Sequence, residues 1–117
     1  MATNLEGNVQ LQRFIELLSV LNHQAVDMLK TGDTNILFSM NNTVEEMYSI
    51  QQKGTEDAYT VIDEDMKIIR ENYLASITMI QSNEDGKFDI ATGFAVKKFV
   101  HNIFDATVRI IMQYGLA

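Results

Sequence analysis

Two histidines in this chain are each followed by an aspartate four positions later, His23 by Asp27 and His101 by Asp105. Residues at i and i+4 share one face of an α-helix, so each pair would present an imidazole and a carboxylate together. Four such groups on adjacent helices would be enough for a tetrahedral zinc site. Both pairs, however, fall on the outward side of the apolar spacing around them. We therefore predict surface pairs with no metal or other cofactor bound, and keep these four residues as the candidates for a metal site.

The acidic segment at residues 83–89 resembles the middle of an EF-hand calcium loop. If Gly86 is the turn glycine, Asn83 and Asp85 occupy the third and fifth ligand positions. The first and twelfth positions would then be Gln81 and Thr92, so the first acidic ligand and the bidentate glutamate are missing. The Asp-Gly pair therefore predicts a connection between two helices and no calcium site.

Other catalytic chemistries lack the residues they require. The chain has no cysteine for a thiolate nucleophile, no Gly-x-Ser-x-Gly elbow and no glycine-rich phosphate loop. It also lacks the Glu-x-x-His tetrapeptide of di-metal bundles. A phosphotransfer bundle using His23 would carry a lysine where Val26 stands. These absences favour a role other than catalysis, although a site assembled from distant residues would leave no motif.

The elements that must position these side chains are predicted to be helices, because apolar residues recur in steps of three and four. Glycines separate the periodic segments, and the absence of proline favours long unbroken helices. We expect helices at about 5–30, 34–52, 56–81 and 89–114. Short connections place neighbours antiparallel. The predicted fold is an all-α, up-down-up-down four-helix bundle with a shorter second helix, forming one domain over residues 1–117.

The charge of the chain restricts its partners. The net charge is −7, and the segment from Asp33 to Asp85 carries eleven acidic against three basic residues. Such a chain is a poor ligand for nucleic acid or for an anionic membrane surface, so we expect neither partner. The densest acidic patch is predicted to be a solvated face: Glu56, Asp57, Asp63, Glu64 and Asp65. The N-terminus lacks the basic and apolar regions of a secretory signal, so we expect a cytoplasmic location.

The last predicted helix is the most informative segment for function. Five of the ten aromatic residues lie between positions 88 and 114, and apolar residues spread beyond a single stripe. Either this helix is the central element of the core, or another copy or another protein covers part of it. We predict the second, with these partner-binding residues: Phe94, Phe99, Phe104, Val108, Ile111 and Tyr114. The expected function is a non-catalytic protein–protein interaction module, namely an adaptor, a chaperone-like binder or a homo-oligomeric structural subunit; the alternative is a bundle that binds a small ligand or a metal.

One segment resembles a known family. The run Val26–Asp33, with its Gly-Asp turn, followed by Leu37 is similar to the first helical hairpin of small cytoplasmic chaperones that serve flagellar or type III export substrates. The resemblance covers this hairpin alone. It implies a helical hairpin and carries no binding residue over to this chain.

Overall fold

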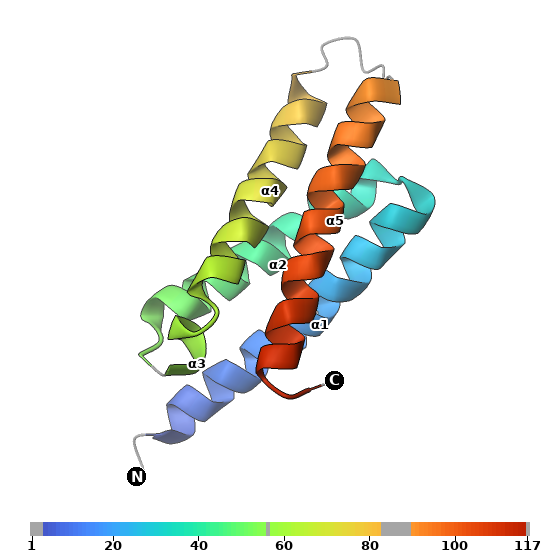
Figure 1. The fold of residues 1–117 in the computed structure, drawn as a ribbon. Coiled ribbons are helices and arrows are strands. Elements are labelled where there is room, and N and C mark those ends of the chain that lie inside the picture. The colour runs from blue at the N-terminus through green and yellow to red at the C-terminus, as the bar shows by residue number, and fades with distance from the viewer. Residues whose placement is uncertain (1–3, 56, 83–89, 117) are drawn as a thin grey trace.

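All regular secondary structure in the described residues is α-helical (Figure 1). The computed structural model describes the backbone of residues 4–55, 57–82 and 90–116, with side chains from residue 9 onward. The all-α class predicted from the spacing of apolar residues is confirmed. The helices of this part of the chain are α1 (Asn4–Thr31), α2 (Thr34–Lys53), α3 (Asp57–Thr60), α4 (Asp63–Gln81) and α5 (Ile90–Gln113).

The turn between α1 and α2 consists of Gly32 and Asp33. Gly32 has φ of +68°, a conformation that is open to glycine because it lacks a Cβ. The Gly32 N–H donates to the Met28 carbonyl at 2.8 Å, which closes α1. The Asp33 carboxylate accepts the N–H of Asn35 at 3.0 Å and caps α2. This short turn brings α2 back against α1, with which it packs.

The segment expected to form one helix over 56–81 contains two helices. The short α3 ends at Thr60, a turn follows at Val61 and Ile62, and α4 begins at Asp63. Three consecutive β-branched residues, Thr60 to Ile62, lower the helix propensity at this point. The turn lets both Tyr59 and Ile62 reach the core. Residue 56, where the helix was expected to start, and the start of the last helix at 89 lie outside the described residues.

The four long helices pack around one core as a bundle (Figure 1). The pair α4 and α5 has the most extensive contact, followed by α1 with α2 and α1 with α5, whereas α2 and α4 touch sparingly. In Figure 1 the end of α4 and the start of α5 reach beyond the turn between α1 and α2. The largest side chains that are fully buried come from all four helices and the turn before α4: Phe14, Leu18, Leu21, Leu37, Met40, Met47, Ile62, Met66, Ile69, Ile103 and Ile110.

One end of the bundle is closed by an aromatic cluster, which we name the closed end. It consists of Phe14 on α1, Tyr59 on α3 and Tyr114 just after α5. The Phe14 ring meets Tyr59 edge-on with centroids 5.6 Å apart, and its centroid lies 6.5 Å from that of Tyr114. The Tyr114 hydroxyl donates to the Ala58 carbonyl at 2.8 Å. Residues from three distant parts of the chain therefore hold α3 against the bundle.

The helix α5 buries one face completely. Phe99 is half-buried, and the core side chains are Val96, Val100, Ile103, Ala106, Thr107 and Ile110. Polar pairs join this helix to both neighbours: Asn102 donates to Asn72 of α4 at 3.0 Å, and Asn22 of α1 donates to Thr107 at 2.9 Å. Among the described residues, none of the helices combines the length and the hydrophobicity that crossing a membrane requires.

Candidate functional site

The first histidine pair lies on the exposed side of α1. His23 Nδ1 donates to the Ser19 carbonyl of its own helix at 2.8 Å. Asp27 is also exposed, and its backbone carbonyl accepts the Thr31 hydroxyl at 2.8 Å. The outward orientation predicted from the apolar stripe is confirmed for both residues. Neither residue lines the pocket between α2 and α4 or the groove beside the start of α5, both of which are described below.

The second pair lies on the outer face of α5 and is joined by a direct contact. His101 Nδ1 is 3.2 Å from Asp105 Oδ2, with 61% of the His101 side chain and 46% of the Asp105 side chain exposed. The His101 ring also lies 6.3 Å from the Phe104 ring. No three His, Asp or Glu side chains in the described part of the chain cluster closely enough to hold a metal. The four-ligand arrangement is therefore not formed there, and the calcium-like segment 83–89 lies outside the described residues.

The predicted partner-binding residues occupy different environments. Phe94 is exposed over 71% of its surface. Phe99, Phe104, Val108 and Ile111 are half-buried, and Phe104 and Ile111 pack against the core.

Tyr114 belongs to the closed end, where burial raises its pKa above the usual tyrosine value and the neighbouring Tyr59 adds to the shift. Its ring and its hydroxyl are both used within the fold. We therefore assign Tyr114 a structural role.

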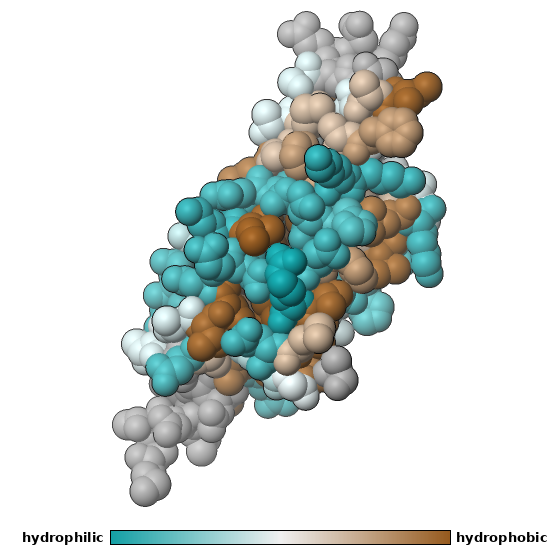
Figure 2. Space-filling view, viewed as in Figure 1, coloured by the Kyte–Doolittle hydropathy of each residue, from teal (hydrophilic) through white to brown (hydrophobic). Residues whose placement is uncertain are grey.

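Phe94 stands beside an apolar groove at the end of the bundle opposite the aromatic cluster, which we name the open end. Ile90, one turn earlier on α5, is the most exposed large apolar residue in the described part of the chain, at 80%. The groove is a cavity of about 240 Å³ with Lys97 on its wall, and its other lining residues are Met28, Gly32, Ile90, Gly93, Phe94 and Val96. Figure 2 shows this hydrophobic surface at the upper right, over the start of α5. Such a groove accommodates an apolar side chain from another molecule.

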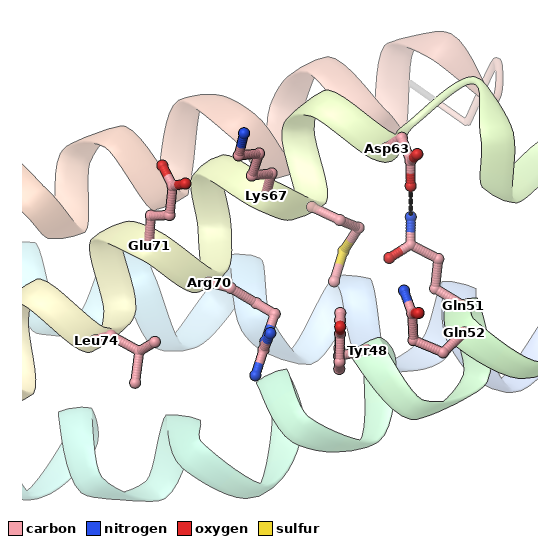
Figure 3. Close-up of a pocket in the computed structure, with 9 residues that line it drawn as sticks. Tyr48, Gln51, Gln52, Asp63, Lys67, Arg70, Glu71 and Leu74 are labelled. Carbon is pink, nitrogen blue, oxygen red and sulfur yellow. Dashed lines mark hydrogen bonds between the residues drawn. The ribbon is translucent and has the colours of Figure 1, made fainter.

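A second pocket of about 310 Å³ lies between α2 and α4, which contact each other less than the other three pairs of neighbouring long helices do (Figure 3). The Arg70 guanidinium lies 3.7 Å from the centre of the Tyr48 ring and 3.7 Å from Glu45. At the other end of the pocket, Gln51 donates to Asp63 at 2.8 Å. Lys67 and Glu71 project from α4 along the upper edge in Figure 3. This pocket offers charges of both signs to a small polar ligand, and its lining includes no serine, histidine or cysteine nucleophile.

Sequence reasoning missed both pockets and two residues of the open end. Ile90 and Lys97 lie four residues before and three residues after Phe94, so helical spacing could have identified them as neighbours on the same face. The pocket between α2 and α4 had no such signal, because it depends on how far two helices diverge. Comparison with known proteins finds no matching family, no matching curated protein and no matching solved structure.

Proposed function

We propose that this chain is a non-catalytic protein–protein interaction module that binds its partner through α5. The observation that carries the proposal is the open end, where Ile90 and Phe94 are exposed one helical turn apart beside an apolar groove. Contiguous apolar surface of this kind tends to mark an interface, and aromatic anchors dominate binding energy at interfaces. Phe104 and Val108, half-buried further along the helix, extend the same surface.

The proposal includes the architecture and setting of the module. We propose an antiparallel, up-down-up-down arrangement of the long helices within a single domain, acting in the cytoplasm as an adaptor, a chaperone-like binder or a homo-oligomeric subunit. The net charge of −7 supports a protein partner over nucleic acid or an anionic membrane.

Photo-cross-linking from a residue of the open end tests this function. A photoreactive amino acid replaces Phe94 in the full chain expressed in its native host, and cross-linked products are identified by mass spectrometry. The matched control replaces Phe38, an exposed phenylalanine on α2. We expect protein adducts, of this chain or of another protein, at position 94 at least about tenfold more abundant than at position 38. Equal labelling at both positions would contradict the proposal.

A second candidate function, the binding of a small polar molecule, is favoured by the pocket between α2 and α4. The Arg70 guanidinium, stacked on Tyr48, is the group best placed to hold a carboxylate or phosphate. A thermal-shift screen of small anionic metabolites tests this candidate, with Arg70→Met as the variant and Arg13→Met as the control. A ligand that stabilises the natural chain and the control, but not Arg70→Met, would support this candidate.

Metal binding at the two histidine pairs is a separate question, which metal analysis of untagged protein tests.

A further inference from the structure

The outer face of α5 carries a stripe of seven residues that reads the same in both directions. The intervals along it are 4, 3, 4, 4, 3 and 4 residues, with His101 at the centre. At 3.6 residues per turn these positions lie on one face, over a length of about 33 Å. The stripe, named here the α5 outer stripe, consists of Ile90, Phe94, Lys97, His101, Asp105, Val108 and Met112.

The chemistry of the α5 outer stripe is also arranged symmetrically about His101. Apolar residues occupy both ends, a lysine lies four positions before the centre, and an aspartate lies four positions after it. The apolar residues Ile90, Phe94 and Met112 are 80%, 71% and 66% exposed. His101 is also exposed, whereas Asp105 is half-buried. Five of the seven residues are exposed in the described part of the chain, and only Asp105 and Val108 are half-buried, so most of this face can meet a second molecule.

We propose that two copies of this chain associate through the α5 outer stripe, antiparallel about a two-fold axis at His101. This inference rests on the proposed function, and it identifies the partner as a second copy. Under that axis, Lys97 faces Asp105 of the second copy, and the apolar ends pack against each other. Ile90 meets Met112 of the second copy, and Phe94 meets Val108 of the second copy. Every residue except the central histidine meets a complementary one, as a self-complementary interface requires.

Charge favours this orientation over the parallel one. A parallel pairing would place Lys97 against Lys97 and Asp105 against Asp105, and juxtaposed like charges oppose association. In the antiparallel pairing two Lys97–Asp105 contacts form, one on each side of the axis. The contact between His101 and Asp105 within each chain holds the carboxylate beside the axis. The stripe repeats after 11 residues, an average spacing of about 3.7 residues, which is close to the turn of a straight α-helix and suits two helices that pack with a slight right-handed supercoil.

Charge reversal in two separate chains tests the proposal. Sedimentation equilibrium at micromolar to submillimolar concentration should show a dimer for the natural chain. Lys97→Asp alone and Asp105→Lys alone should each raise the dissociation constant at least about tenfold. An equimolar mixture of the two variants should form a heterodimer, because both charge contacts are then restored, and the double variant should again form a homodimer.

The apolar contribution is tested with Phe94→Glu against Phe38→Glu. The first should raise the dissociation constant at least about 100-fold, since both copies lose an anchor, and the second should leave it unchanged. Helical circular dichroism confirms that each variant is folded.

The register of the two helices is tested with single cysteines, because the natural chain has none. His101→Cys should be joined by a short thiol–thiol cross-linker, and Ser49→Cys on α2 should not.

Three results would overturn the inference. They are a natural chain that stays monomeric over the whole concentration range, a dimer insensitive to the α5 variants, and a mixture of charge-reversed chains that stays monomeric. A monomer that still forms adducts with a different protein at position 94 overturns the self-association alone and leaves the interaction function in place. Equal labelling at positions 94 and 38 contradicts the function itself.

Discussion

The two ends of the bundle use aromatic residues in opposite ways. At the closed end Phe14 is fully buried and packs edge-on against Tyr59, while Tyr114 donates to the backbone of α3. At the open end Phe94 is mostly in solvent and lines an apolar groove. The closed end has α3 to cover it, whereas α4 and α5 extend past the turn that joins α1 and α2 (Figure 1). A similar side chain therefore stabilises the fold at one end and is left available for binding at the other.

Truncating one phenylalanine at each end gives the largest contrast. Phe14→Ala should lower the free energy of unfolding by about 3–5 kcal/mol, because it opens a cavity among buried aromatic rings. Phe94→Ala should change the free energy of unfolding by less than about 0.5 kcal/mol, because the Phe94 ring is already mostly exposed in the folded chain. Urea denaturation of the two variants at a concentration where the chain is monomeric measures both values. Equal losses would show that Phe94 belongs to the core.

Replacing a glycine should also cost more stability near the closed end than near the open end. A Cβ on Gly54 would overlap the Tyr59 ring, so Gly54→Ala should displace that ring and cost about 1–3 kcal/mol. Gly32 lies in open space, and Gly32→Ala should cost about 1 kcal/mol through its positive φ alone. Near-ultraviolet circular dichroism separates the two causes, because only Gly54→Ala should change the tyrosine signal.

Alkaline titration should reveal the buried tyrosine of the closed end. The pKa of Tyr114 is raised in the fold, so the fold favours its neutral form. That contribution is complete below the usual tyrosine pKa of about 10 and is lost as the pH rises above it. Tyr114→Phe should cost about 1 kcal/mol at neutral pH, from the lost hydrogen bond to Ala58, and should flatten the alkaline decline.

A second variant for this titration is Tyr73→Phe on α4. Burial also raises the pKa of Tyr73, with a smaller addition from the Glu45 carboxylate. The two variants should therefore each remove part of the alkaline decline. An unchanged decline in Tyr114→Phe would contradict the role assigned to its hydroxyl.

The smallest expected effect concerns an exposed ion pair between α1 and α2. Arg13 binds both carboxylate oxygens of Glu46, at 2.8 and 3.1 Å, and the hydrogen bonds lower the pKa of Glu46. The lowered pKa contributes stability above the usual glutamate pKa and loses it as the pH falls. Because solvent screens the pair, Glu46→Gln should lower the Tm by at most about 2 °C at neutral pH. The difference should vanish in acid, and Glu71→Gln on α4 serves as the control.

Much of the fold was predictable because its signals are local. The helical spacing of apolar residues, the Gly32 turn and the Asp33 cap each depend on residues close together in the chain. The division of the third helix was missed although its cause is local, since three β-branched residues weaken a helix only slightly on their own. The turn between α3 and α4 brings both Tyr59 and Ile62 into the core, a contribution to the break that the local sequence does not reveal.

The candidate site was predictable in part. The outward orientation of His23 and of His101 followed from the apolar stripe. Phe94, predicted to bind a partner, is exposed. Tyr114 was assigned to the same surface, but its hydroxyl and ring serve the closed end. Helical spacing cannot distinguish these cases, because whether an apolar residue beyond the main stripe is covered depends on which helix lies beside it.

The sequence by itself determined that the chain is helical, that α5 carries more apolar surface than one face requires, and that the α5 outer stripe is symmetric about His101. Only the tertiary structure decided that Tyr114, just after α5, packs against α3, whereas Phe94 near the start of α5 is left exposed. The physical reason is that periodicity along a helix is set by neighbouring residues, whereas burial is set by the lengths and divergence of helices that are distant in the chain.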